Sequence, residues 1–453
     1  MRQKIRTTTT APAGLRRELG LGSATAAVAG SAIAVGIFLT PAGMAKSLGS
    51  PFWLLVVWLA VGAMTLSGAL CFGELAGRFP RDGGQYVYLH ETFGARVAFL
   101  FGWMCLLVLD PGLTAALSVG MAEYGAYIFH WSPLTVKLAA LIAVWALCVL
   151  NILSIRITAG FLRWITWLKL GTLGLITVWA IVFRLGAWSN FHPFVAQHAG
   201  SENLGPALAG AFVGAFFSFG GWWDVSKIAG EIRDPGRTLP RALLLGVAIV
   251  TVVYILVSAV FVYLIPLNAV TSGETFVAQA GEVMFGHSGG VVFAAIVVIC
   301  ILGGLAAFIM FAPRVYYAMA KDGLFLPAVA RIHPRFGTPV VAIAIQGTIA
   351  SLLIAFGSFE KIIPYFMFAA VGYLGLTVAG LFVVRSRHEE AGAVVLAPAY
   401  PLTPCVFLLM VLVLLAMILM RNPTQALLGL AIVATGLPVY EVLNWTAARS
   451  AHE

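Results

Sequence analysis

About twelve apolar stretches, each long enough to cross a lipid bilayer as a helix, follow one another along the chain. A membrane-spanning helix needs about 20 predominantly apolar residues. Backbone polar groups inside lipid must be satisfied within the segment itself, so these stretches predict an all-α polytopic membrane protein. The expected spans are 21–45, 52–76, 94–128, 134–155, 161–185, 205–226, 242–265, 288–318, 338–357, 361–384, 401–420 and 424–446.

The composition excludes a soluble protein. Of the 453 residues 61% are hydrophobic and 10% are charged, whereas soluble domains are about 45–50% apolar and about 25% charged. The net charge of +9 does not indicate nucleic-acid binding, because the basic residues lie between apolar runs. The five cysteines fit neither a metal site nor a disulfide framework, so we expect no cofactor and no metal.

The distribution of basic residues predicts the orientation in the membrane. Most of the 27 Lys and Arg residues fall in the N-terminal tail, the C-terminus and the loops on their side. Cytoplasmic loops carry such an excess, so both termini are expected in the cytoplasm, at the plasma membrane or the bacterial inner membrane. The opposite side has few basic residues, namely Lys46, Lys137, Arg184, Lys361 and Arg421.

Two of the spans are interrupted by glycines near their centres. The first span reads GSAIAVGIF over 30–38, and the sixth reads FFSFGGWW over 216–223. Irregular backbone at that depth is tolerated only inside protein or beside a wet cavity. A matching pair of interrupted spans is the strongest sequence indication of a transporter's binding site. The alternative is that these glycines only permit close packing of helices.

A helix broken in mid-membrane offers free N–H groups on one half and free carbonyl groups on the other. Such ends suit a zwitterionic amino acid, with its carboxylate at the amides and its ammonium at the carbonyls. The predicted carboxylate site comprises the amides of Val35 and Gly36, close to Ala34. The predicted ammonium site comprises the carbonyls of Ala32, Ile33, Phe217, Ser218 and Gly220.

Several motifs follow one another over about residues 20–385. They are GIFLTP at 36–41, ALCFGEL at 69–75, PRDGGQY at 80–86, FGGW at 219–222, EIRDPGRTLP at 231–240, PRVYYAMAKDG at 313–323 and HPRFGTP at 333–339. In this order they resemble the amino acid–polyamine–organocation superfamily. The resemblance is greatest to its L-type amino acid transporter branch and to bacterial amino acid permeases.

This resemblance implies a core of ten helices in two inverted repeats, about 21–185 and 205–385, and the transport of amino acids or related molecules. Residues 1–20 would then be a basic cytoplasmic tail, and 386–453 would add two helices and a short cytoplasmic C-terminus. The chain departs from the family where Ala34-Val35-Gly36 replaces the frequent Gly-Ser-Gly. The loop at 130–133 lacks the cysteine that links eukaryotic relatives to a glycoprotein, so no disulfide-linked subunit is expected.

Lys169 lies inside the fifth span, where an ammonium must face protein or water. Carbonyls at the first break could satisfy it. The resemblance implies that it stands where sodium-driven relatives hold a sodium ion, and that it could couple transport to a proton. The alternative is that Lys169 extends to the cytoplasmic surface.

Aromatic and aliphatic side chains are expected to complete the site. The resemblance places Phe217 over the substrate. Leu109, Leu113 and Leu117 recur four residues apart and share one helix face, which the resemblance directs to the substrate side chain. Periodicity alone would assign the three leucines to the core.

The acidic residues fall into two groups. Glu74 and Glu231 lie near cytoplasmic span ends and are interpreted mainly as salt bridges or gates with local arginines. Asp110 and Asp224 lie within spans, where a carboxylate is a functional candidate. Asp224 could pair with Lys227 or meet a cationic substrate.

The sequence therefore predicts a carrier of neutral L-amino acids that works by alternating access, as an exchanger or a proton symporter. A carrier of cationic amino acids or polyamines is the main alternative, and sodium-driven uptake a lesser one. A membrane enzyme would need a polar catalytic cluster, and a channel would need a ring of filter residues. Neither is evident in the sequence.

Overall fold

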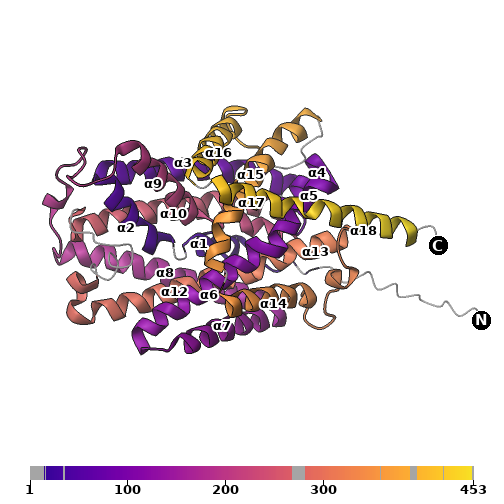
Figure 1. Ribbon diagram of the computed structural model, residues 1–453, viewed down its shortest axis with the longest axis horizontal. Coiled ribbons are helices and arrows are strands. Elements are labelled where there is room, and N and C mark those ends of the chain that lie inside the picture. The colour runs from indigo at the N-terminus through magenta and orange to yellow at the C-terminus, as the bar shows by residue number, and fades with distance from the viewer. Residues whose placement is uncertain are drawn as a thin grey trace, which may run out of the picture.

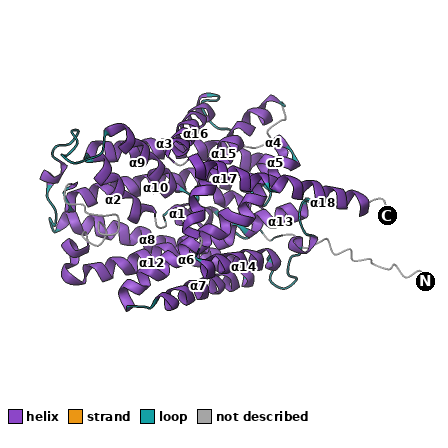
Figure 2. Ribbon diagram, viewed as in Figure 1, coloured by secondary structure: helices purple, strands orange, loops and turns teal. Residues whose placement is uncertain are grey.

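The chain is helical almost throughout the part that the structure, a computed structural model, describes (Figure 2). The predicted all-α class is therefore confirmed. Most of the predicted basic tail, together with Ala34 and Val35 of the first break, lies outside this part. The described residues are Leu15 and the ranges 17–33, 36–267, 281–357, 359–387, 395–421 and 423–450.

The helices follow one another with short connections (Figure 1). The first half contains α1 (Leu21–Ala32), α2 (Gly36–Leu48), α3 (Pro51–Arg78), α4 (Gln85–Phe93), α5 (Ala95–Met104), η1 (Cys105–Leu109), α6 (Asp110–Phe129), α7 (Pro133–Leu153), α8 (Ile155–Val182) and η2 (Trp188–Phe191). The second half contains α9 (Leu204–Phe219), η3 (Trp222–Glu231), α10 (Pro235–Leu264), η5 (Gly286–Ser288), α12 (Gly289–Phe311), α13 (Pro313–Lys321), η6 (Pro327–Ala330), α14 (Val340–Phe356), α15 (Phe359–Ser386), α16 (Leu402–Arg421), α17 (Pro423–Ala434) and α18 (Gly436–Ser450).

Ten helical stretches of the described chain are long and apolar enough to cross a membrane. They coincide with ten of the twelve predicted spans. The two others are α14, which is apolar but shorter, and the first span, which is divided into α1 and α2. A multi-pass membrane protein follows directly from this pattern.

Both predicted breaks are present, and each occurs at small residues. The helix α1 ends at Ala32 and α2 begins at Gly36. The helix α9 ends at Phe219, and its chain turns through Gly220 and Gly221 into the short helix η3. Gly221 has φ +95°, a conformation that only glycine adopts readily.

The third span contains a π-helical turn, η1, directly before Asp110 and Pro111. Pro111 lacks an N–H group to donate within the helix, which favours a kink or tilt of the span at this point. Such π-helical turns are rare and occur mostly as single turns within α-helices, frequently at functional sites. Here it lies beside the buried carboxylate of Asp110.

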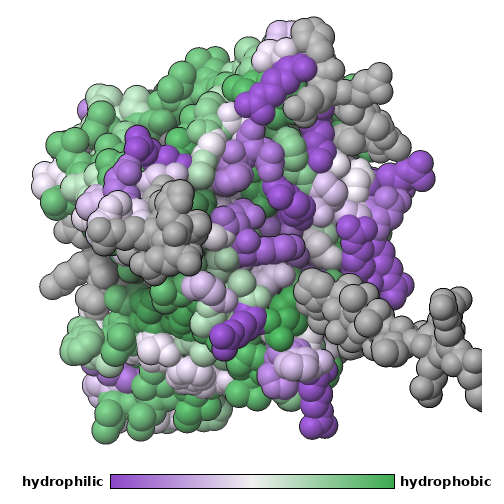
Figure 3. Space-filling model, turned by 90° about the vertical axis from the view of Figure 1, so that its right-hand side faces the viewer, coloured by the Kyte–Doolittle hydropathy of each residue, from purple (hydrophilic) through white to green (hydrophobic). Residues whose placement is uncertain are grey.

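The bundle has two distinct ends. In Figure 1, α2 and α9 lie in the left-hand half, whereas α4, α13 and α18 lie in the right-hand half. Figure 3 views this second end, which we call the α13 end, and shows hydrophilic residues gathered on it with hydrophobic ones around the sides. This arrangement suits a helical bundle whose sides face lipid and whose end faces water.

Candidate functional site

The two breaks meet in the centre of the bundle and share hydrogen-bond partners. The hydroxyl of Tyr254, on α10, lies 2.8 Å from the carbonyl oxygen of Ala32 and 2.7 Å from that of Ser218. The hydroxyl of Ser31 lies 2.9 Å from the carbonyl oxygen of Gly221. Buried hydroxyl groups therefore donate to carbonyl groups that the two breaks leave free. Backbone polar groups at membrane depth need such partners, because lipid offers none.

Gly36 allows the start of α2 to approach the end of α9 closely. A Cβ atom on Gly36 would lie 2.5 Å from Cα of Ser218, closer than real Cβ contacts allow. One turn further along α2, the hydroxyls of Thr40 and Ser218 are 2.6 Å apart. The start of α2 is thus held directly against the end of α9.

Lys169, on α8, donates hydrogen bonds from its ammonium to backbone carbonyl groups at the first break. Its Nζ donates to the carbonyl oxygens of Gly30 at 2.9 Å and Ile33 at 2.6 Å. Lys169 is 1% exposed, so its side chain does not extend to the surface. The predicted contact with break carbonyls is confirmed, while its role in coupling stays a prediction.

A largely apolar cavity lies between the breaks and the helices α6, α12 and α15. Its wall includes all three leucines of the predicted stripe, Leu109, Leu113 and Leu117, together with Phe217, which is 40% exposed. The further lining residues are Ser31, Ala32, Gly36, Asp110, Phe216, Ser218, Gly220, Gly221, Trp223, Asp224, Phe308, Met367, Ala370, Val371 and Leu374.

These positions bring most of the predicted site residues together. Several carbonyls predicted to meet the substrate ammonium have partners within the protein. Ile33 is fully buried and its carbonyl accepts from Lys169. The carbonyls of Ala32 and Ser218 accept from Tyr254. Ala34 and Val35 lie outside the described residues. The carbonyl of Phe217 accepts from the N–H of Gly220, which leaves it less available to a substrate ammonium.

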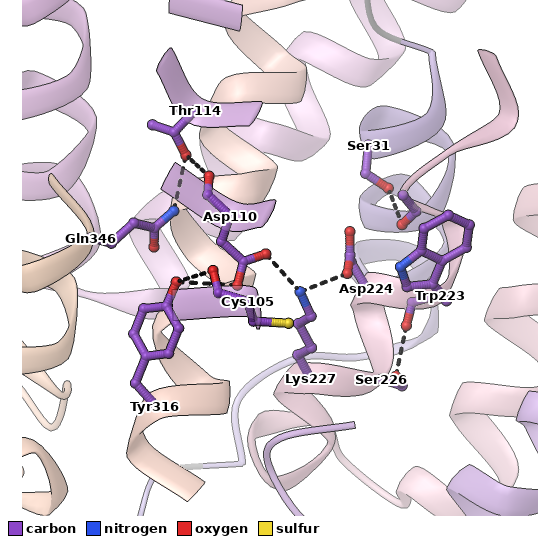
Figure 4. A network of polar contacts seen from close by, with 11 residues as sticks. Ser31, Cys105, Asp110, Thr114, Trp223, Asp224, Ser226, Lys227, Tyr316 and Gln346 are labelled. Atoms are coloured by element: carbon purple, nitrogen blue, oxygen red, sulfur yellow. Dashed lines mark hydrogen bonds and ion pairs between the residues drawn. The ribbon is translucent and has the colours of Figure 1, made fainter. Parts of the chain in front are cut away.

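Three charged side chains form a cluster at the edge of the cavity, seen in Figure 4. Nζ of Lys227 lies 3.2 Å from Oδ1 of Asp110 and 2.9 Å from Oδ1 of Asp224. The hydroxyl of Tyr316 donates to Oδ2 of Asp110 at 3.2 Å. The predicted pairing of Asp224 with Lys227 is confirmed.

A second buried ion pair lies toward the α13 end. Nε of Arg314 donates to Oε1 of Glu231 at 2.8 Å, and both side chains are 0% exposed. The sequence suggested a local arginine as the partner of Glu231. The structure corrects this, because the end of η3 turns Glu231 inward toward α13. Asp82 lies close by and accepts from the N–H of Gly230 at 2.9 Å.

Glu74 is a structural anchor rather than part of the cavity. Its carboxylate accepts from Arg78, as predicted, and from Nε of Arg385 on α15 at 3.0 Å. It also accepts from the N–H of Ala397 at 2.8 Å. Glu74 therefore ties α3 to α15 and to the segment before α16.

Three residues with important contacts were not predicted from the sequence: Tyr254, Tyr316 and Arg314. Tyr254 and Tyr316 are aromatic residues in apolar spans, and only the folded chain brings their hydroxyls to break carbonyls and to Asp110. Arg314 falls within a quoted motif, PRVYYAMAKDG, and a charged residue at the end of a long apolar run was the available signal.

A helical membrane protein whose first and sixth spans are broken around one central cavity has the architecture of a secondary transporter. The chain belongs to the amino acid permease family, whose model matches residues 19–445. The family lies in the amino acid–polyamine–organocation superfamily, as the sequence motifs suggested. The protein is thus an amino acid permease and not an enzyme.

Curated relatives match over nearly the whole chain. The serine/threonine exchanger SteT of Bacillus subtilis is 29% identical over 431 residues, covering 94% of this chain and 97% of the relative. The human b(0,+)-type amino acid transporter 1 is 29% identical, covering 94% and 88%. The human large neutral amino acids transporter small subunit 2 is 30% identical, covering 94% and 80%.

Substituting Gly36 tests the contact between the breaks. Gly36→Ala places a Cβ 2.5 Å from the backbone of Ser218, so α2 or α9 must shift. We expect transport per folded molecule to fall by at least about tenfold, because displacements near 1 Å disturb a binding geometry strongly. Gly43→Ala, on the same helix with nothing within 4 Å, is the matched control. Equal transport by the two variants would show that the close approach is dispensable.

The carboxyl of Asp82 predicts a pH dependence of stability. Burial, and next the charge of Glu231, raise the pKa of Asp82 to about 7. The folded protein therefore binds this proton more tightly than the unfolded chain, and stability falls as pH rises toward 7. Asp82→Asn should reduce the fall in melting temperature between about pH 5 and about pH 8. An unchanged slope in Asp82→Asn would assign the dependence to other groups.

Proposed function

We propose that this permease exchanges neutral L-amino acids across the plasma membrane, the inner membrane in a bacterium, by alternating access. The observation that carries the proposal is that both broken spans open on one cavity whose wall is mostly apolar. Backbone dipoles at the breaks can hold the two poles of a zwitterion. The leucine stripe and Phe217 provide an apolar environment for the substrate side chain.

The roles of the individual residues follow from this arrangement. The substrate carboxylate would bind at the start of α2, at the amides of Gly36 and its preceding residue Val35. The ammonium would meet carbonyl oxygens near Ala32 and Gly220. Lys169 holds the end of α1 in position, since its ammonium occupies the carbonyls that a bound cation would otherwise need. This favours exchange or proton coupling over sodium coupling.

The proposed transport cycle needs a defined topology. We propose two inverted halves, about 21–185 and 205–385, with 386–453 as an addition. We place the α13 end and both termini in the cytoplasm because of the basic loops. Function without a disulfide-linked subunit is also proposed, since the loop at 130–133 carries no cysteine.

Counterflow in proteoliposomes tests the function. Purified protein is reconstituted with unlabelled L-leucine, L-serine, L-threonine, L-arginine or putrescine inside, and uptake of each labelled compound is followed with and without a sodium gradient. We expect neutral amino acids to exchange with one another and sodium to have no effect. Uptake driven by sodium alone, without internal substrate, would refute the exchange mechanism.

A cationic amino acid or a polyamine is the second candidate substrate. The supporting observation is that the carboxylates of Asp110 and Asp224 line the cavity. Lys227 contacts both of them, which reduces the charge available to a substrate cation. Preferential exchange of L-arginine or putrescine in the same assay would favour this candidate over neutral amino acids.

A further inference from the structure

The charged cluster at the cavity contains more negative than positive groups. Asp110, Asp224 and Lys227 are at most 3% exposed at their side chains. With all three ionised, two carboxylates face a single ammonium, and one negative charge is unbalanced. An unpaired charge away from water is strongly unfavourable, and a buried group usually neutralises instead.

In the part of the chain that the structure describes, no other basic group balances this charge. Among the described residues, the remaining titratable side chains that face the cluster are Cys105 on η1, with which both carboxylates interact, and Tyr316 on α13. Tyr373 on α15 interacts with Cys105. The other pocket-lining residues of α1, α12 and α15 are apolar or, like Ser31, uncharged. A thiol and two phenols add no positive charge.

The two carboxylates differ in their hydrogen bonds. Asp110 accepts from Lys227 through Oδ1 and from Tyr316 through Oδ2, so its anion is well stabilised. Oδ1 of Asp224 lies 2.9 Å from Nζ of Lys227, which is the one charged partner of Asp224 among the described residues. Asp224 thus has one stabilising partner where Asp110 has two. Asp224 also lines the cavity, from which a proton can reach it.

We propose that the Asp110–Lys227–Asp224 cluster is a proton-binding site, with Asp224 as the group that takes up and releases the proton. When protonated, Asp224 leaves Lys227 paired with Asp110 alone, and the cluster is neutral. Protonation thus matches the buried arrangement seen here, in which η3 is joined to α6 by the Lys227–Asp110 pair and to α13 by the Glu231–Arg314 pair.

The position of the cluster connects the proton to transport. Asp224 and Lys227 are on η3, directly after the second break, whereas Asp110 and Tyr316 are on α6 and α13. A movement of η3 that admitted water to the cluster would stabilise the charged form and release the proton. This coupling rests on the proposed transport function, but proton binding itself does not.

Infrared difference spectroscopy of the purified protein tests proton binding without any substrate. The spectra are compared between about pH 5 and about pH 8, where exposed carboxylates stay ionised. The Asp82→Asn background removes the other carboxyl expected to titrate there. We expect a protonated-carboxyl band in this background and its loss when Asp224→Asn or Asp110→Asn is added, because either leaves one carboxylate with one ammonium.

Uptake into proteoliposomes tests the coupling. With labelled L-leucine as probe, no internal substrate and an alkaline interior, wild-type protein should accumulate leucine, up to about tenfold per pH unit for one proton. Asp224→Asn should lose this accumulation when it is expressed relative to the counterflow rate of the same variant. Asp322→Asn, a carboxylate at the end of α13, is the matched control and should behave as wild type.

The proposal is overturned if the carboxyl band persists when Asp82→Asn is combined with Asp224→Asn or with Asp110→Asn. It is also overturned if Asp224→Asn shows the same proton-driven accumulation as wild-type protein. Because Asp224→Asn and Asp110→Asn are both measured, one of them can still decide the question if the other fails to fold. If wild-type protein exchanged no amino acid, the proposed function would fail, while the infrared result would still decide whether the cluster binds a proton.

Discussion

Lys169→Ala is expected to reduce amino acid exchange per folded molecule on the order of 100-fold, because two charge-assisted hydrogen bonds worth about 1.5–3 kcal/mol each are lost. The ammonium of Lys169 is the donor that holds the carbonyls of Gly30 and Ile33 at the first break. Without it, the end of α1 loses the geometry that the proposed binding site needs.

Two controls separate this role from general damage. Lys169→Met keeps the length of the side chain without its charge and should be equally inactive. Lys137→Ala removes an exposed lysine that donates to a single helix-end carbonyl, that of Ala355, and should leave exchange intact. Rates are measured by counterflow and normalised to monodisperse protein. Normal turnover in Lys169→Ala would remove the lysine from the mechanism.

Arg314→Met is expected to give the largest loss of stability. The substitution leaves Glu231 buried without its cation, and breaking a buried ion pair costs about 3–5 kcal/mol. Melting followed by tryptophan fluorescence should show a large drop for Arg314→Met. Much of it should be recovered in Arg314→Met combined with Glu231→Gln, because the second change removes the uncompensated charge.

An exposed ion pair provides the comparison for Arg314. Arg96 and Glu441 form a pair in which both side chains are more than half exposed. Exposed pairs contribute about 0.2–1 kcal/mol, so Arg96→Ala should melt close to wild type. A similar melting temperature for Arg314→Met and Arg96→Ala would contradict the structural role assigned to the buried pair.

The fold was largely predictable because its determinants are local in the sequence. Apolar length marks the spans, and glycines mark the breaks at 30–38 and 216–223. The leucine stripe was predictable from two sources. Helical periodicity places Leu109, Leu113 and Leu117 on one face, the family resemblance directs that face toward the substrate, and all three leucines line the cavity.

The long-range pairings were not predictable in the same way. Lys227 is three residues from Asp224, and that pairing was predicted, whereas its contact with Asp110 joins residues 117 positions apart. Likewise, Glu231 has arginines nearby in sequence but pairs with Arg314, because the turn of η3 directs it toward α13. Only the packing of helices fixes which of several charged residues meet.

The most direct test of the whole account is a cryo-electron microscopy structure with the neutral amino acid that best drives exchange. The account predicts substrate density between the two breaks, with the carboxylate at the start of α2 beside Gly36. The side chain should lie against Leu109, Leu113 and Leu117. Substrate density elsewhere in the molecule, with this cavity vacant at saturating substrate, would contradict it.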